Sequence, residues 1–321
     1  MRSYEYNLPK YYINSISKVN DRIPDGVKMI KAPEFWEKGR MGEGIVIAVI
    51  DTGCDVNHPD LQDRIAGVKN FTSDDGGDTN NVTDYVGHGT HVCGIIAANE
   101  NSSGIIGVAP RAKLLVLKSI TSNGGTAEWV IDAINYAIDQ KVNIISMSLG
   151  SNTPNDDLYI AIKRAVNNNI LCVCAAGNNG DNNSETDELN YPAYYSEAIS
   201  VGSINIERKF SPFSDSNNEV DLVAPGQGFG KKGILSTAPG ARYVEMQGTS
   251  MATPHVAGAL ALIINWSKDN FKRELGEVEL YAQLIKRTIS LGYNKKMEGN
   301  GMLYLSTEEL LTKVISSEQI F

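Results

Sequence analysis

The stretch "IVIAVIDTG", residues 45 to 53, joins an unbroken apolar run to an aspartate and a turn glycine. Such a run is typical of a strand that is covered on both faces, as the strands of parallel sheets are. Asp51 follows the run directly, and open α/β sheets build their binding sites at the carboxyl ends of strands. We therefore expect Asp51 at the functional edge of a parallel sheet. The alternative is an ordinary helix-capping aspartate.

Further apolar runs alternate with helical patterns along the chain. Besides 45–50, the expected strands are 114–118, 143–149, 170–176 and 198–202. The expected helices are 126–140, with Thr126 as its cap, 156–169 and 253–266. The last of these is apolar almost all round, which predicts a central, buried helix. This order favours an α/β fold with a mostly parallel central sheet and helices on both faces.

Length and charge narrow the class of protein. The chain has 321 residues, of which 42% are hydrophobic, so it can bury one large core. We expect a main domain at 25–305, a polar, tyrosine-rich extension at 1–24 and a peripheral helix or tail at 306–321. The formal net charge of -9 argues against nucleic acid or an anionic membrane as a partner. No window resembles a membrane span or a signal peptide, and we expect a cytoplasmic protein.

Cysteine usage agrees with a reducing compartment. Cys172 and Cys174 lie two residues apart in an expected strand, so both project from one sheet face and cannot readily form a disulfide. The four thiols are typical of small buried hydrophobic side chains. A zinc site is the alternative, but the chain has no paired CxxC motif. The residues close enough in sequence for such a site are Cys54, His58, His88, His91 and Cys93.

Three further motifs place polar residues beside the expected strands and helices. In "GHGTHVCGIIAA" (87–98), His88 begins a helix-like stretch; in "AAGNNG" (175–180), a turn exposes Asn178; in "GTSMATPH" (248–255), Ser250 precedes the buried helix. Each motif also has an ordinary explanation: a structural histidine, a turn asparagine or a serine that caps a helix. Considered one at a time, none of them indicates a function.

Together with Asp51, these residues supply the groups that acyl transfer requires. Ser250 Oγ would attack a carbonyl carbon, His88 would take and return the proton, and Asp51 would orient the imidazole. The Asn178 amide and the Ser250 backbone N–H would donate to the oxyanion, and the helix dipole would add to this stabilisation.

The motifs "DTG", "GHGTHVCG", "AAGNNG" and "GTSMATPHVAG", in this order, resemble those of the subtilisin-like serine proteases over residues 25–305. "IKAPEFW", "IDTGC", "FTSDDGG" and "LYLS" are most similar to the intracellular subtilisins of bacilli. The resemblance implies a cytoplasmic serine endopeptidase of subtilisin-like α/β fold that acts on proteins and peptides, and a homodimer. A lipase or esterase is disfavoured because it requires GxSxG, whereas Ala252 takes the place of the second glycine.

The resemblance also implies how a substrate binds. A peptide would lie as an extra strand between two segments of the chain, held by backbone hydrogen bonds. Ala127 stands where many relatives carry an aromatic residue, so the fourth subsite is expected to be more open. Asn190 is expected near the base of the primary pocket. The full set of substrate-binding residues is Ser148, Leu149, Gly150, Gly124, Gly125 and Asn190.

Calcium is the cofactor that the resemblance suggests, because hard oxygen ligands suit Ca²⁺. One candidate site combines carboxylates of Glu219 and Asp221 with backbone carbonyls, and its alternative is a solvated charged turn. The carbonyls would come from Ala193, Tyr195 and Ala198. A second candidate pairs Asp60 with Asn101 in the loop 99–104, although its N-terminal ligand is not identifiable.

The N-terminal extension raises the question of control. Intracellular relatives carry a short extension that crosses their own active site until it is clipped, and we expect residues 6–11 to do this here. Leu8 and Pro9 are the central residues, with Pro9 fixing the local backbone against cleavage. The family's Leu-Ile-Pro-Tyr is replaced by Asn7-Leu8-Pro9-Lys10, which lacks the aromatic residue.

Two other readings stay open at this stage. A catalytically silent peptide-binding protein could keep the same fold, but it would have no need of the four residues Asp51, His88, Asn178 and Ser250. A mature secreted protease is disfavoured by the extension and by the four apparently free thiols. The glycine-rich stretch 226–233 is longer than we expect for this family.

Overall fold

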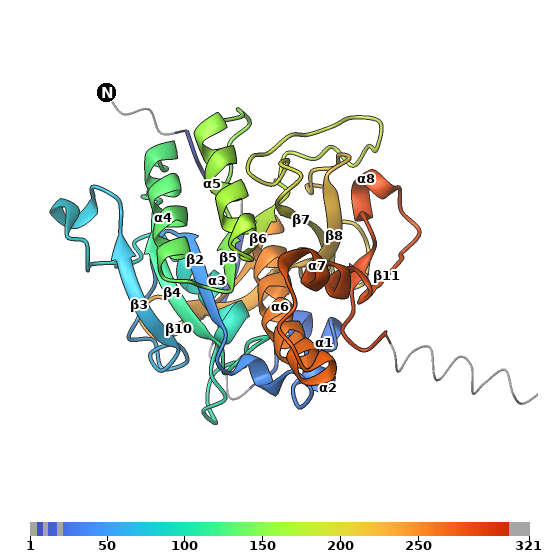
Figure 1. The fold of residues 1–321 in the computed structure, drawn as a ribbon, viewed down its shortest axis with the longest axis horizontal. Coiled ribbons are helices and arrows are strands. Elements are labelled where there is room, and N and C mark those ends of the chain that lie inside the picture. The colour runs from blue at the N-terminus through green and yellow to red at the C-terminus, as the bar shows by residue number, and fades with distance from the viewer. Residues whose placement is uncertain (1–4, 9–11, 18–21, 308–321) are drawn as a thin grey trace, which may run out of the picture.

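A computed structural model describes residues 5–8, 12–17 and 22–307 (Figure 1). Within these residues, the largest element is a nine-stranded sheet with the order β11-β12-β8-β7-β6-β5-β2-β4-β3. Neighbouring strands are parallel except for β11 and β12. The strands are β2 (Val46–Asp51), β3 (Ile65–Asn70), β4 (Lys113–Lys118), β5 (Ile144–Met147), β6 (Leu171–Ala175), β7 (Ile199–Asn205), β8 (Val220–Gln227), β11 (Thr288–Ile289) and β12 (Met302–Leu303).

Helices cover both faces of this sheet. The long helices are α3 (His88–Ala97), α4 (Ala127–Asp139), α5 (Asp156–Asn167), α6 (Thr249–Phe271) and α7 (Glu277–Ile285). The short ones are α1 (Asp25–Met29), α2 (Ala32–Phe35), α8 (Lys295–Glu298) and the 3-10 turns η1 (Arg40–Gly42) and η2 (Asp74–Gly77). In Figure 1, α4 and α5 lie side by side across the strands, and α6 lies near the middle of the molecule.

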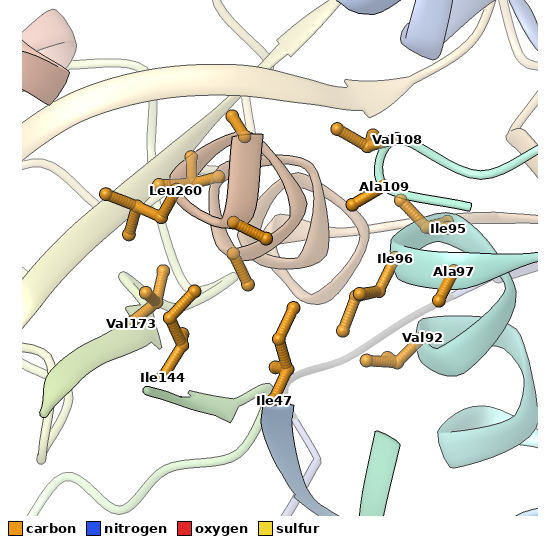
Figure 2. Packing of buried hydrophobic residues seen from close by; sticks show 14 of the residues in the cluster. Ile47, Val92, Ile95, Ile96, Ala97, Val108, Ala109, Ile144, Val173 and Leu260 are labelled. Atoms are coloured by element: carbon orange, nitrogen blue, oxygen red, sulfur yellow. The ribbon is translucent and has the colours of Figure 1, made fainter. Parts of the chain in front are cut away.

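Alternation along the strands explains why both faces need cover. Ile47 and Val49 of β2 belong to the apolar cluster that contains α3 and α6, whereas Ala48 and Ile50 belong to the cluster that contains α4 and α5. Figure 2 shows Ile47 among the side chains that gather around α6. Each fully buried aliphatic side chain of this kind contributes about 1.5–3 kcal/mol. The uninterrupted apolar run at 45–50 is therefore the signature of a strand with a core on each side.

The expected α/β architecture is confirmed, with one correction at α6. All five expected strands are present within a few residues of their predicted bounds, as are α4 and α5. Thr126 caps α4, because its Oγ1 accepts a hydrogen bond from Trp129 N at 3.2 Å. The helix expected at 253–266 instead begins at Thr249 and ends at Phe271. Its early start places Ser250 inside the first turn of the helix.

A second, three-stranded antiparallel sheet was not predicted. It has the order β1-β10-β9 and consists of β1 (Tyr12–Ser17), β9 (Ile234–Ala238) and β10 (Arg242–Gln247). The N-terminal extension thus contributes a strand, which agrees with an extended segment laid on the domain. Most of the tail expected at 306–321 lies outside the described residues.

The stretch 226–233 comprises the last two residues of β8 and the turn that leads to β9. Gly228 N donates to Lys232 O at 3.0 Å, and Lys232 N donates to Phe229 O at 3.0 Å. Phe229 is exposed at the tip of this turn, and nothing in the structure explains its extra length.

Candidate active site

The carboxyl ends of the parallel strands form the edge on which the predicted residues meet. Asp51 ends β2, which lies between β4 and β5, at the point where the strand order changes direction. Ser148 follows the end of β5, and Asn178 follows the end of β6 by three residues. Because parallel strands end at the same edge, three segments far apart in sequence converge here.

His88 and Asp51 are in direct contact. His88 Nδ1 lies 2.8 Å from Asp51 Oδ1, and both side chains are buried. A carboxylate can only accept, so the Nδ1–H of His88 donates to Asp51, and the neutral ring carries its proton on Nδ1. Thr52 N donates to the same carboxylate oxygen at 2.7 Å. Helix α3 approaches closely because of Gly89, where a Cβ atom would lie 2.1 Å from Gly53 O.

Asp84 connects the two segments that carry Asp51 and His88, and sequence reasoning missed it. Its Oδ1 accepts from Thr52 Oγ1 at 2.8 Å and from Gly87 N at 2.7 Å. Its Oδ2 accepts from the N and Oγ1 of Thr90 at 2.8 and 2.7 Å. An acidic residue just ahead of a helix favours the exposed N–H groups of the first turn. The signal was thus present in the sequence, four residues before His88.

Ser250 is the second residue of α6, whose N-cap is Gly248. The alternative that Ser250 is a helix cap is therefore wrong. Its Oγ donates to Ser148 O at 3.4 Å. Its carbonyl oxygen accepts from Ser148 Oγ at 3.0 Å, in place of the N–H that Pro254 lacks four residues later. Ser148 therefore joins the start of α6 to the end of β5.

Asn178 is buried, not exposed as expected from the sequence, and it is held by the residue next to Ser250. Its Oδ1 accepts from Thr249 N at 2.8 Å and from Thr249 Oγ1 at 2.9 Å. Both hydrogen bonds use the amide oxygen, so they fix the orientation of the amide and turn its NH₂ group away from Thr249. Asn178 and the first turn of α6 thus form one unit at the sheet edge.

The expected substrate-binding segments contact the chain's own extension. Tyr6 pairs with Gly125 and Asn7 pairs with Gly150, each in antiparallel register. A cavity of about 240 Å³ lies here, with Gly150 and Asn190 among its lining residues. Asn190 Nδ2 donates to Ala175 O at 2.9 Å. The remaining predicted members are also placed: Gly124 lies in a turn with Thr121, and Ser148 and Leu149 are buried beside Gly150.

The first candidate calcium site lies where a turn enters a strand: Glu219 is half-buried in the turn, and β8 begins at the next residue. Asp221 belongs to β8, and its Oδ2 accepts from Ser200 N at 2.8 Å, while its Oδ1 accepts from Tyr281 OH. Burial raises the pKa of Asp221 to about 6, and the nearby carboxylate of Glu219 adds to this increase. The two acidic residues line a common cavity of about 220 Å³, to whose lining Lys295 also contributes. The bond to Ser200 N connects Asp221 to the segment that contains Ala198, two residues before Ser200.

The second candidate brings its two residues together in a different way. Asp60 is fully buried, and its Oδ1 accepts from Asn101 Nδ2 at 3.1 Å. Its Oδ2 accepts from Ile105 N and Tyr243 OH, each at 3.0 Å. The Asn101 amide thus presents its NH₂ group, not its oxygen, to the carboxylate. This arrangement does not fit a cation between the two side chains.

No zinc-type cluster is found in the part of the chain that the structure describes, because no group of three or more His, Cys, Asp or Glu side chains could hold a metal ion. His58 Nε2 lies 3.1 Å from Arg242 O, and His91 Nε2 lies 2.9 Å from Ile234 O. Burial lowers the pKa of His91 to about 3, so this ring is neutral. All four cysteines are buried and free of disulfides, as the sequence predicted.

Comparison with known proteins defines the class. A sequence model of the subtilase family matches residues 42–303, which include Asp51, His88, Asn178 and Ser250. The chain therefore belongs to the subtilase family and is a subtilisin-like serine protease.

Individual relatives agree. The chain is 55% identical over 314 residues to the intracellular serine protease of Paenibacillus polymyxa, covering 98% of this chain and 94% of that protein. It is 52% identical over 312 residues to the major intracellular serine protease of Bacillus subtilis, covering 96% of each. Subtilisin E of Bacillus subtilis is 40% identical over 264 residues, covering 81% of this chain and 66% of that protein. Among the described residues, no helix has the length and apolar character to cross a membrane.

Proposed function

We propose that the chain hydrolyses peptide bonds in proteins, with Ser250 as nucleophile, His88 as general base and Asp51 as the residue that orients His88. The observation that carries this proposal is the buried 2.8 Å hydrogen bond between His88 Nδ1 and Asp51 Oδ1. It occurs at the edge of the sheet where Ser250 and Asn178 also lie, in a chain that belongs to a protease family.

The chemistry follows from the tautomer of His88. Since Nδ1 carries the hydrogen shared with Asp51, Nε2 is the ring nitrogen that accepts the Ser250 hydroxyl proton. Ser250 Oγ then bonds to the substrate carbonyl carbon, and the displaced electron pair moves to the carbonyl oxygen. His88 returns the proton to the leaving amine as the C–N bond breaks. Water repeats the sequence, with His88 as base, and releases the acid product from the acyl-serine.

Charge on the carbonyl oxygen is stabilised by groups already in position. The NH₂ group of Asn178 and the backbone N–H of Ser250 donate to the oxyanion, and the positive end of the α6 dipole lies next to them. The two bonds from Thr249 to Asn178 Oδ1 hold the amide in this orientation. Removing one such donor costs about 100- to 1,000-fold in kcat in related chemistry.

Whole-protein mass spectrometry after treatment with phenylmethylsulfonyl fluoride tests the nucleophile. We expect one sulfonyl adduct on the protein that lacks residues 1–18, and none on the same protein carrying Ser250→Ala. If the protein remains unlabelled and inactive on peptides, Ser250 is not an activated nucleophile. The catalytically silent peptide-binding protein then becomes the better explanation of this fold.

We further propose that the N-terminal extension occupies the substrate groove. Residues 5–7 form backbone hydrogen bonds of 2.7 to 3.0 Å with Gly125 and Gly150, the pattern by which a peptide adds a strand. The Tyr6 side chain is only 1% exposed and belongs to the cluster that includes Leu149. Ala127 packs against the same cluster, which supports a proposal that Tyr6 of the extension takes the open fourth subsite expected from Ala127.

The next part of the extension lies along β10, which leads to Ser250. Tyr12 pairs with Gln247, and Ser17 pairs with Tyr243. The described residues before and after Pro9 thus contact two segments that both lie next to Ser250, which supports an extension that blocks the site. Leu8 is half-buried and lines the cavity beside Gly150, whereas Pro9 lies outside the described residues.

Deleting residues 1–18 tests this inhibition. We expect a higher initial rate on a chromogenic peptide than for the full-length protein, whose rate should rise only as the extension is cleaved. Equal initial rates, with equal sulfonylation rates at Ser250, would show that the extension does not block the site.

Three finer properties are proposals that rest on the family resemblance. Calcium fits the Glu219–Asp221 site better than the Asp60 loop, since two carboxylates share a cavity there and each retains acceptor capacity. In such a site Glu219 and Asp221 would hold the cation, and its role would be structural. An intracellular location follows the names of the relatives. A homodimer is the third proposal, which sedimentation velocity checks.

A further inference from the structure

One buried carboxylate near the proposed active site takes no part in the chemistry above. Asp215 lies in the segment between β7 and β8 and is fully buried. Its Oδ1 accepts a hydrogen bond from Asn179 N, and its own backbone N donates to Gly177 O at 3.0 Å. Its Oδ2 forms no hydrogen bond to the described residues. A buried carboxylate with one oxygen left without a hydrogen bond lowers the stability of the fold, so its presence here calls for an explanation.

The contacts of Asp215 all fall on the turn that carries Asn178. Gly177 and Asn179, on either side of Asn178, bond to the backbone and carboxylate of Asp215. Gly180 N donates to Phe213 O at 2.9 Å, so the next residue along the turn is held by the same segment. Hydrogen bonds to Phe213 and Asp215 thus hold the backbone on both sides of Asn178.

Gly177 is the residue that permits this close approach. A Cβ atom there would lie 1.9 Å from Asp215 Oδ2, and the glycine has a φ of +119°, a conformation that other residues rarely adopt. The turn and the carboxylate therefore fit only as a pair.

Asn178 is consequently held at two points. Its side-chain oxygen is bound by Thr249, at the start of the helix that carries Ser250. Its backbone is bound by Asp215 through the neighbouring residues. The first contact sets the rotation of the amide, and the second sets the position of the turn relative to the sheet.

We propose that Asp215 is a positioning residue, which holds the 177–180 turn so that the Asn178 NH₂ group meets the oxyanion at hydrogen-bonding distance. This inference rests on the proposed protease function. The bond to Asn179 N requires only an acceptor oxygen at this position, which a carboxyl group supplies whether or not it is protonated. Oxyanion stabilisation depends on donors that are already in place, and a displacement of about 1 Å can cost up to ~100-fold in rate.

The test is a comparison of Asp215→Ala and Asp215→Asn in the protein lacking residues 1–18. Rates on a chromogenic peptide are divided by the concentration of active sites, measured by sulfonylation of Ser250. We expect Asp215→Ala to lower kcat about 10- to 100-fold with little change in KM, because the turn acts on the transition state more than on the bound peptide. Asp215→Asn should keep most of the parent kcat, since its amide oxygen can accept from Asn179 N.

Two controls separate positioning from general damage. Asp181→Ala removes an exposed carboxylate of the same loop, which bonds Asn183 N, and should leave kcat unchanged. Asp215→Ser keeps a polar side chain but does not reach Asn179 N, so it replaces the alanine variant if that protein does not fold. A fall in kcat that Asp215→Asn does not rescue would contradict the inference.

A double-mutant cycle with Asn178→Ala tests whether Asp215 affects kcat through Asn178. If Asp215 acts through Asn178, Asp215→Ala should change kcat by less than about twofold once Asn178 is already alanine. An equal loss of kcat in both backgrounds would overturn the inference, as would a parent-like kcat for Asp215→Ala. Failure of the parent protein itself to cleave peptides or to react at Ser250 would instead reject the protease function on which the inference depends.

Discussion

Two buried aspartates beside the proposed triad differ in how their charge is satisfied. Both oxygens of Asp84 accept hydrogen bonds, from Thr52 and Gly87 on one side and from Thr90 on the other. Asp215 has one oxygen without such a bond to the described residues. Burial accordingly raises the pKa of Asp215 to about 7, with the charge of Glu188 adding to the effect. The first aspartate stabilises the site, whereas the second holds it at a cost in stability.

This difference gives a stability prediction for Asp215→Asn. The pKa of Asp215 is about 7 in the folded protein and about 3.9 in the unfolded chain. Between these two pH values, the folded protein has Asp215 protonated and the unfolded chain does not. The parent therefore loses stability as the pH rises through this window, and the variant does not. Relative to the parent, Asp215→Asn should gain ~2 kcal/mol more at pH 8 than at about pH 5.5. Urea unfolding at the two pH values measures this, and an identical difference at both would contradict it.

Among the elements, the first turn of α6 depends on a contact with Ser148, the residue that follows β5. Pro254 removes the backbone donor that would reach Ser250 O in a regular helix, and Ser148 Oγ supplies a replacement at 3.0 Å. The predicted start at residue 253 was wrong because a proline near the beginning of an apolar run is commonly the first helical residue. Here the helix extends further towards the N-terminus, and a side chain from another element satisfies the carbonyl.

Ser148→Ala should therefore destabilise the protein. The substitution leaves the buried Ser250 carbonyl without this donor, which typically costs about 1–3 kcal/mol. Denaturant unfolding of the Ser250→Ala protein, with and without Ser148→Ala, gives this value without interference from self-cleavage. Ser151→Ala serves as a control, since Ser151 is only half-buried and its hydroxyl accepts a hydrogen bond from the nearby Thr153 N. Equal stability of all three proteins would show that the contact contributes nothing.

The tightness with which the N-terminal extension binds the substrate groove can also be tested. Tyr6 contributes a buried side chain, while the exposed Asn7 contributes only backbone hydrogen bonds to Gly150. Losing a buried aromatic side chain of this size costs about 1.5–3 kcal/mol, so Tyr6→Ala should raise the initial rate of the full-length protein about tenfold or more. Asn7→Ala should change it little. If Tyr6→Ala has the same initial rate as the parent, side-chain burial does not hold the extension in the groove.

For the whole molecule, the open question is whether a cation adds to its stability. Glu219 and Asp221 face a common cavity, whereas the carboxylate of Asp60 is held by three hydrogen-bond donors. Millimolar Ca²⁺ added to EGTA-treated protein should raise Tm by a few degrees, by mass action on the folded state. Asp221→Asn should abolish this rise and Asp60→Asn should not. The reverse pattern would place calcium at the Asp60 loop, and no rise at all would exclude a stabilising site under these conditions.

The sequence by itself determined the class of fold and most of the candidate site. Periodicity was sufficient for the buried strands, because a run such as 45–50 is apolar on both faces only in a covered parallel sheet. It also placed Asp51 and Asn178 at the carboxyl edge that parallel strands share, whereas His88 and Ser250 were assigned from their motifs and from the family resemblance. Strands β9 and β10 were not predicted, because their apolar and polar residues alternate only weakly and because β10 pairs with the distant N-terminal extension.

Only the tertiary structure decided the contacts that hold these residues in place. Ser148 supplies the hydrogen-bond donor that Pro254, 106 residues further on, lacks. Asp215, in the segment after β7, accepts a hydrogen bond from the turn that follows β6. Such contacts depend on where a chain returns in space, and local patterns of apolar and polar residues do not record this. The sequence therefore showed which groups could react, and the packing of distant segments determined how each of them is held.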